Sequence, residues 1–367
     1  MARKLKYDKL LFLATLLLVG TSVVMVYSAS AALAMQNQQP TYYFLFKQVT
    51  WAALGVCLLS LVMRVDYRNL KQPVIIWTAL GVSIAALVAV FFVGPEISGS
   101  RRWFALGGIG VQPSELAKVA VIIFAAATLE RRMDKIDQIT HALGPIALVT
   151  AVVCGLIVIE PDFGTAFTVL LIVGVMVFVA GLHYRYLTGS ILVMAPLLFV
   201  ILAAAPYRRD RLLSFLDPWA DPQGSGWQII QSEIAVGTGH LFGEGLMGGV
   251  QKLFYLPAPH TDFIYAVIAE ETGLLGATAV LVCFAVIIWR GLRVTIGAPD
   301  RFGGFLALGI TTMLGFQAFF NISVVLGLLP TKGISLPFVS AGGSSLLVCL
   351  LGMGILLNVS QHASADV

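Results

Sequence analysis

The sequence predicts an all-α, polytopic membrane protein with about ten transmembrane helices. Of its 367 residues, 58% are hydrophobic and only 11% are charged, whereas a soluble domain is about one quarter charged. The apolar runs reach the roughly 20 residues that a helical span needs, and they exceed the strands of about ten alternating residues in a β-barrel. The cysteines lie singly inside these runs, which argues against a disulfide framework or a zinc site: Cys57, Cys154, Cys283 and Cys349.

The apolar runs predict ten spans, which form a single integral membrane domain over residues 1–367. The spans cover residues 10–34, 44–63, 73–93, 113–129, 143–159, 164–182, 187–205, 263–289, 302–326 and 343–360. A large loop over 206–262 separates the seventh span from the eighth, and its aromatic residues predict short helices on the membrane surface rather than disorder. The basic N-terminus precedes a run too long for a signal peptide, so we expect a retained first span.

Charge asymmetry orients the chain. Lys and Arg gather near the N-terminus and in short loops on the same side, for example at 64–71 and 131–135. Under the positive-inside rule this side is cytoplasmic. Both termini are therefore expected in the cytoplasm, with the 206–262 loop on the outer side of the cytoplasmic (inner) membrane. The net charge of +4 indicates orientation rather than nucleic-acid binding.

The stretch "APHTDFIYAVIAEETG", from Ala258 to Gly273, brings three acids to the start of the eighth span. Asp262 could cap the helix that follows, or it could be an outward-facing carboxylate that acts as a general base. Glu270 and Glu271 would lie about 12 Å deeper in a straight helix, where each charge costs about 2.5–3.5 kcal/mol. We expect them to pair, to face a wet cavity or to lie in a segment outside the hydrocarbon, and to form with Asp262 the floor of an outward-facing site. The alternative is a structural role in closing a loop against a neighbouring span.

Three other stretches place polar residues beside apolar runs. In "QPSELAK", Glu115 and Lys118 share a helix face, either as a weak exposed pair or as a buried pair that orients a site. "EPDFGT" is a tight turn, and Glu160 and Asp162 in it are secondary candidates. "LPTKGISLPFVSAGGSS" mixes helix breakers with apolar residues, which predicts a re-entrant loop with Lys332 at its mouth.

Arginines on the outer side fit a phosphate-bearing ligand, because guanidinium groups bind phosphate oxygens in forked geometry. They are Arg101, Arg102, Arg208, Arg209 and Arg211. Anionic lipid head groups are the alternative partner for these side chains.

Several stretches, taken in order, resemble the motifs of the SEDS family, named for shape, elongation, division and sporulation. They are "GSRRWF", "QPSELAK", "EPDFGT", "TDFIYAVIAEETGLLG" and "PTKGISLPFVSAGGSS". The resemblance covers essentially the whole chain, and the short N-terminus resembles the elongation branch more than the division branch.

This resemblance implies a peptidoglycan glycosyltransferase that polymerises lipid II at the outer face of the membrane during cell elongation. It implies as partners a class B penicillin-binding protein, which is the transpeptidase, and other elongation-complex membrane proteins. It also matches Asp262 to the family's essential carboxylate and the pair of Glu115 and Lys118 to its membrane ion pair.

The residues are consistent with that chemistry, in which a sugar 4-hydroxyl displaces a lipid pyrophosphate from an anomeric carbon. Glycosidases need two carboxylates because their leaving alkoxide must be protonated. Pyrophosphate leaves without that help, so one base, Asp262, and several cations suffice. The cations expected to hold pyrophosphate are Arg101, Arg102, Arg208, Arg209 and Lys332.

No cofactor is certain from the sequence. A divalent cation, Mg or Mn, could share the task of holding pyrophosphate, with His260 and Asp262 as ligands, although no metal-site spacing is present. The secondary candidates for the site are Glu160, Asp162, His260, Glu270, Glu271, Ser340 and Ser344.

Two other functions stay open. A flippase for lipid-linked precursors would place essential charges along a path through the whole bilayer, whereas the polar residues here gather in the outer half. A non-catalytic scaffold for partner proteins would tolerate Asp262→Asn, which keeps the size of the side chain and removes its charge. Within the family, the division branch is the alternative to the elongation branch.

Overall fold

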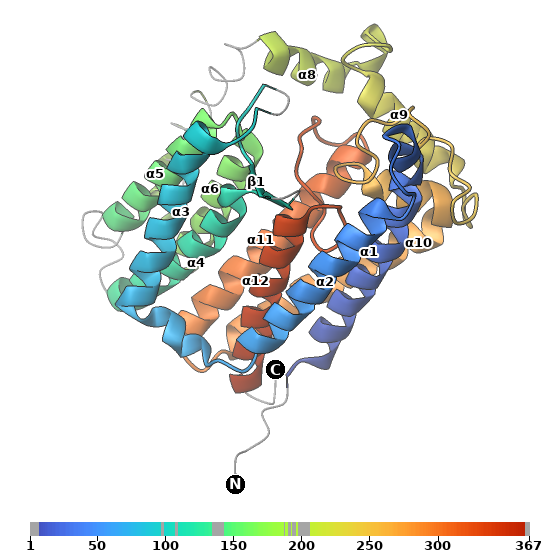
Figure 1. Cartoon of the computed structure of the whole chain (residues 1–367). Helices are drawn as coiled ribbons and strands as arrows, with labels where there is room; N and C mark the ends of the chain where they lie inside the picture. The colour runs from blue at the N-terminus through green and yellow to red at the C-terminus, as the bar shows by residue number, and fades with distance from the viewer. Residues whose placement is uncertain are drawn as a thin grey trace.

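The computed structural model describes residues 7–96, 99–106, 109–133, 143–186, 188–189, 192, 196 and 206–363. Long helices dominate these residues (Figure 1). They are α1 (Lys9–Gln36), α2 (Tyr43–Val62), α3 (Pro73–Val93), α4 (Pro113–Arg132), α5 (Gly144–Ile159), α6 (Phe163–Val179), α10 (Ile264–Gly297), α11 (Arg301–Val325) and α12 (Gly343–His362). A helix lies at nine of the ten predicted spans, whereas the seventh, 187–205, lies almost entirely outside the described residues.

The helices suit a membrane and end where the sequence changes character. Six of the described helices are long and apolar enough to cross a membrane, and α5 and α6 are shorter apolar helices. Proline opens α3 and α4 at the first helical position, where its missing N–H costs nothing. The Asp162 carboxylate caps α6 by accepting a hydrogen bond from the Thr165 N–H.

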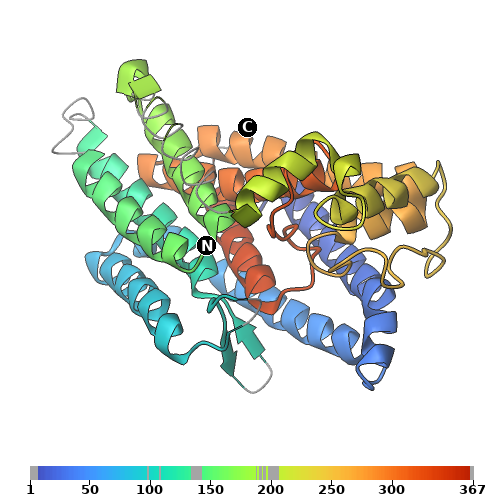
Figure 2. The same cartoon turned by 90° about the horizontal axis from the view of Figure 1, so that it is seen from above.

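The centre of the bundle is formed by α4, α11 and α12, whose side chains are mostly buried. The outer helices surround them (Figures 1 and 2) and expose large apolar side chains, such as Trp77 and Phe92 on α3. Glycine lets α2 and α12 approach closely, because a Cβ on Gly55 would overlap Leu350. The exposed apolar surface is therefore the lipid-facing surface of a polytopic bundle.

The α10 helix is broken at Gly273, where the backbone leaves the helical region (φ 66°, ψ −166°). Only glycine fits there, since a Cβ would collide with the backbone of Leu241 and Gly243. The half before the break, 264–272, is almost wholly buried in protein. The half after it, 274–297, has a length of about 36 Å and can cross the bilayer alone. The prediction of one straight span over 263–289 was therefore wrong in shape and ended too early.

Two connections carry structure of their own. A short antiparallel hairpin of β1 (Phe104–Leu106) and β2 (Ile109–Val111) precedes α4, and the sequence analysis did not predict it. The long loop contains α8 (Pro206–Leu216), the 3-10 helix η4 (Pro218–Ala220) and α9 (Trp227–Thr238), which confirms the predicted short helices. Figures 1 and 2 show this loop covering the end of the bundle where α10 begins. At the opposite end, the 3-10 helix η1 (Tyr67–Lys71) joins α2 to α3.

Candidate active site

Asp262 ends the long loop, directly before α10, and its side chain is partly buried. It does not cap α10, because the capping position is Phe263 and no side chain caps the helix. The Asp262 carbonyl accepts a hydrogen bond of 2.7 Å from the side-chain amide of Asn321 on α11. The same amide donates to the Ile334 carbonyl at 2.8 Å, so one buried side chain ties Asp262 to the loop between α11 and α12.

That loop, over residues 326–342, is irregular and packs into the protein, as the helix breakers in its sequence predict. The Ser340 hydroxyl donates to the Thr261 carbonyl at 2.7 Å, and the Ala341 N–H donates to the His260 carbonyl at 2.9 Å. Gly333 lies against the Asp262 carboxylate, since a Cβ on this glycine would come within 3.1 Å of Oδ2. The loop thus forms one wall beside the carboxylate of Asp262.

Asp162 lies on the other side of the same loop, at the start of α6. Its carboxylate accepts hydrogen bonds from the Gln112 amide at 3.0 Å and from the Thr165 hydroxyl at 2.7 Å. A Cβ on Gly164 would come within 3.1 Å of Ile334, so the start of α6 packs against the loop. Two aspartates from distant parts of the chain therefore flank residues 333–334.

The charges around Asp262 set its proton affinity. Burial raises the pKa of Asp262 to about 6, the positive charge of Arg211 lowers this pKa, and the negative charge of Asp162 raises it. Arg211 comes from α8, and its guanidinium donates to the Thr331 carbonyl at 3.3 Å. A carboxylate with a pKa near 6 is deprotonated at neutral pH and still basic enough to accept a proton, as a general base must be.

Glu160 is fully buried beside this site, and neither of its carboxylate oxygens has a hydrogen-bond partner. Burial, followed by the charge of Asp162, raises the pKa of Glu160 to about 8, and Arg102 lowers it. Arg102 donates to the carbonyls of Glu160 and Pro161 at 2.7 and 3.0 Å. Arg102 therefore stabilises the turn that carries Asp162. The sequence had predicted a different role for Arg102, the binding of pyrophosphate.

Glu115 and Lys118 form a buried ion pair on α4, with 2.8 Å between Oε1 and Nζ. Their side chains are 7% and 2% exposed, so the exposed-pair alternative was wrong. The pair lies one turn inside α4, just after Gln112, which bonds to Asp162 through its side chain and to Ser344 through its N–H. Helices α4, α6 and α12 thus begin around the same site.

The other predicted cations are distributed unevenly. Arg101 is exposed in the connection between α3 and β1, where it donates to the Phe91 carbonyl at 3.2 Å and comes within 3.9 Å of Glu96. Lys332 is partly buried next to Gly333 in the wall beside Asp262. Arg209 is exposed on α8, and the Arg208 side chain lies outside the described residues.

Glu270 and Glu271 do not line this site. The Glu270 carboxylate accepts the N–H groups of Val250 and Gln251 at 2.7 and 3.0 Å. The Glu271 carboxylate forms an ion pair of 2.6 Å with Lys252. The prediction that these acids form the floor of the site with Asp262 was wrong, and the alternative, closing a loop against a neighbouring span, is what the structure shows.

The remaining secondary candidates have structural contacts. His260 packs against the Phe44 ring at 5.3 Å between centroids, and burial lowers its pKa. Ser340 and Ser344 bond to the backbone of Thr261 and Gln112. Within the described residues, no three His, Cys, Asp or Glu side chains gather in a group that could hold a metal ion.

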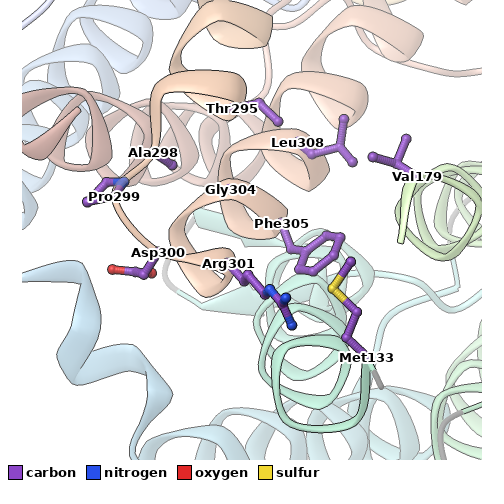
Figure 3. Close-up of a pocket in the computed structure, with 10 residues that line it drawn as sticks. All are labelled: Met133, Val179, Thr295, Ala298, Pro299, Asp300, Arg301, Gly304, Phe305 and Leu308. Atoms are coloured by element: carbon purple, nitrogen blue, oxygen red, sulfur yellow. The ribbon is translucent and has the colours of Figure 1, made fainter. Parts of the chain in front are cut away.

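A pocket of about 400 Å³ lies at the opposite ends of α4, α6 and α10 (Figure 3). It is lined by Met133, Val179, Thr295, Ala298, Pro299, Asp300, Arg301, Gly304, Phe305 and Leu308. None of the predicted site residues belongs to this lining. Because these three helices begin near Asp262 and end at the pocket, the pocket is separated from the candidate site by the depth of the bundle.

Sequence reasoning missed several residues that the structure brings to the site. Gln112, Thr165, Asn321 and Gly333 are uncharged and lie in four different segments, so no spacing in the chain links them to Asp262. The position of Arg211 could have been predicted, because it lies three residues after Arg208 on the same outer helix. Arg211 was nevertheless not among the residues predicted from the sequence to hold pyrophosphate.

The chain is similar to known proteins over nearly its whole length. Residues 8–365 match the family model described as "Cell cycle protein", which covers FtsW, RodA and SpoVE. A "Probable peptidoglycan glycosyltransferase FtsW" from Geobacter metallireducens is 41% identical over 360 residues, covering 97% of this chain and 95% of the relative. The "Stage V sporulation protein E" of Bacillus subtilis is 40% identical over 361 residues, covering 98% and 99%.

Solved structures show the same fold. One chain of a peptidoglycan synthase complex that coordinates polymerization and crosslinking has a TM-score of 0.79 and 34% identity, over 97% of this chain and 98% of that one. The rod shape determining protein RodA of Thermus thermophilus has a TM-score of 0.72 and 30% identity, over 99% of both chains. With its motifs, its fold and its full-length relatives in agreement, this chain belongs to the SEDS family of FtsW, RodA and SpoVE.

Proposed function

We propose that the chain is a peptidoglycan glycosyltransferase that polymerises lipid II, with Asp262 as the general base. The observation that supports this most directly is the carboxylate of Asp262 at the end of the long loop, which lies against Gly333 and whose pKa responds to the charges of Arg211 and Asp162. Relatives over the full length carry the name peptidoglycan glycosyltransferase. A carboxylate with this proton affinity suits the removal of a proton from a sugar hydroxyl.

The proposed reaction joins two lipid-linked sugars. The 4-hydroxyl oxygen of the acceptor attacks the anomeric carbon of the donor, and its proton passes to Asp262. The bond from that carbon to the pyrophosphate oxygen breaks, and its electron pair leaves with the lipid pyrophosphate. Arg211 and Lys332, on two segments beside Asp262, are the cations best placed to stabilise this charge. Arg209, exposed on α8, extends the same basic surface.

We also propose the setting of the reaction. The site faces the outside of the cytoplasmic membrane, both termini are cytoplasmic, and a class B penicillin-binding protein supplies the transpeptidase. A peptidoglycan synthase complex among the similar structures supports such a partner. The relatives named FtsW and SpoVE are 40–41% identical, whereas the RodA structure is 30% identical. These identities favour division or sporulation over the elongation role predicted from the short N-terminus.

The test is the formation of glycan strands from purified lipid II by the chain and its penicillin-binding partner, with the transpeptidase inactivated. A polymerase gives strands in detergent micelles, where there are no two leaflets between which a lipid can move. A flippase or a scaffold gives no strands under these conditions, and such a result would overturn the proposal. Transport of labelled lipid II in proteoliposomes, measured in parallel, separates the flippase from the scaffold.

The rate of strand formation should rise with pH through about 6 and level off above it, because Asp262 must lose its proton to act as a base. An ordinary aspartate would keep the enzyme active to about pH 4. Arg211→Gln removes a positive charge that lowers the pKa of Asp262, so the midpoint should move to higher pH. A profile that is flat near 6, or unmoved by this substitution, contradicts the assignment.

Gly333→Ala should slow strand formation about tenfold, because small displacements of a catalytic group are costly. The new Cβ would come within 3.1 Å of Asp262 Oδ2, so the carboxylate must move by a few tenths of an ångström. Gly342→Ala in the same loop is the control, since its Cβ would meet only the Ser345 side chain at 3.7 Å. Equal rates for the two variants at equal thermal stability would show that Gly333 does not position Asp262.

A further inference from the structure

The segment over residues 241–255, which we call the rim segment, follows α9 and precedes Asp262. Most of its side chains are large, apolar and exposed, although it lies outside any helix. They are Leu241, Phe242, Leu246, Met247, Val250, Leu253, Phe254 and Tyr255, with Phe242 77% and Leu246 62% exposed. A water-facing loop of this composition would be unusual, because loops in water are mostly polar.

The backbone of the rim segment is bonded to the place where α10 starts to cross the membrane. The Leu274 N–H donates to the His240 carbonyl at 2.9 Å, and the Leu275 N–H donates to the Leu241 carbonyl at 3.3 Å. Leu274 and Leu275 are themselves 57% and 60% exposed, directly after the break at Gly273. The exposed apolar surface of α10 therefore adjoins that of the rim segment.

Several backbone N–H groups of the rim segment are bonded to the first half of α10, as exposed backbone in lipid would require. The Glu244 and Gly245 N–H groups donate to the backbone carbonyls of Glu270 and Glu271 at 3.0 and 3.1 Å. The carboxylate of Glu271 accepts the Met247 N–H at 3.0 Å. As described above, the carboxylate of Glu270 accepts two further N–H groups from the segment.

The single cation of the rim segment points inward. Lys252 is buried and donates to Glu271 at 2.6 Å and to Ser28 on α1 at 2.9 Å. A lysine on a loop in water would keep its ammonium group exposed. The exposed charge of the segment, Glu244, is flanked by glycines and can reach the head groups.

We propose that the rim segment is inserted into the membrane interface, in the leaflet on the same side as Asp262, with its apolar side chains among the acyl chains. The partner is lipid, because the surface adjoins that of a membrane-spanning helix and the ammonium group of Lys252 is turned inward. Figure 2 agrees, since the segment between α9 and α10 lies at the outer edge of the bundle. This inference rests on the membrane fold and does not depend on the glycosyltransferase proposal.

Spin labelling of the full chain tests the insertion. Leu246→Cys and Phe254→Cys are labelled with a nitroxide after replacing the two accessible cysteines, Cys57 and Cys283. One chain is placed in each nanodisc of phosphatidylethanolamine and phosphatidylglycerol. Collisions with oxygen, which enters lipid, are compared with collisions with a water-soluble nickel chelate.

Two matched labels calibrate the result. Leu281→Cys lies at an exposed apolar position of α10, and Gln223→Cys lies at an exposed polar position of the same long loop. Labels at 246 and 254 should resemble the one at 281, with nickel collisions several-fold fewer than at 223 and oxygen collisions frequent. Nickel collisions equal to those at 223 would place the segment in water. Few collisions with either reagent would mean that protein covers it. Each of these two results overturns the proposal.

Discussion

Asp262→Asn is expected to lower the rate of glycan-strand formation by about 10²–10⁴, the range that a general base contributes. The amide keeps the size of the side chain, so the contact with Gly333 remains. The hydrogen bond from the Asn321 side chain also remains, because its acceptor is the backbone carbonyl of Asp262. What is lost is the negative charge, and with it the basicity that lets the side chain take the proton of the sugar hydroxyl. The rate is measured with purified lipid II at equal amounts of chain and partner.

Asp217→Asn is the matched control for this experiment. It makes the same chemical change in the same long loop, at an exposed side chain that caps no helix, and should leave the rate unchanged. Binding of the transpeptidase partner should be equal for both variants, which excludes a loss of assembly. If Asp262→Asn keeps the wild-type rate while Gly333→Ala slows it, the loop that carries Gly333 contributes to the reaction and the general base must be another group. If neither variant changes the rate, the site is elsewhere.

Lys118→Met is expected to destabilise the chain by about 3–5 kcal/mol, the usual cost of removing one partner from a buried pair. Methionine fits the space but leaves the Glu115 carboxylate buried without a counter-charge. The second oxygen of that carboxylate already has no hydrogen-bond partner, so nothing nearby can take over the charge. The measurement is thermal unfolding in detergent, where the midpoint should fall by several degrees.

The double variant Glu115→Gln with Lys118→Met separates stability from function. It removes both charges, so the thermal midpoint should return towards that of the wild type. If the pair orients the site, strand formation stays low although stability returns, and recovery of both would show that the pair is only structural. Lys71→Met breaks a pair of 2.7 Å with Glu130 at a partly exposed position. It should cost less than about 1 kcal/mol.

The helices could be predicted from sequence because one physical rule decides them. A run of apolar residues continues until a charge or a helix breaker ends it, as at Pro73 for α3 and at Arg131 and Arg132 for α4. The end of α10 was missed because its last turns carry Arg290 and Arg293. The predicted span ended directly before Arg290, although the long side chain of an arginine can extend from the last turns of a spanning helix to water.

The candidate site was predictable only in part, because contacts between distant segments leave no mark in the local sequence. Asp262 and Asp162 each stand out as acids beside apolar runs, but their approach to residues 333–334 depends on how α6 and α11 pack. The roles of Glu270 and Glu271 depend on a single backbone conformation at Gly273. A straight helix would have pointed these acids into the membrane, and the break lets them accept the N–H groups of the rim segment instead.

The break at Gly273 also divides α10 into a part that crosses the lipid and a part that leads to Asp262. Bilayers differ in hydrophobic thickness, and a spanning helix adapts to this by changing its tilt. In α10 only the part after the break crosses the lipid, while the part before it is enclosed by protein and leads to Asp262. Since the helical hydrogen-bond ladder is interrupted between them, a change of tilt in one part is not transmitted rigidly to the other. Through the helix itself a change of tilt therefore does not reach Asp262, and the link that remains beside the break is the rim segment, which is bonded on both sides of it.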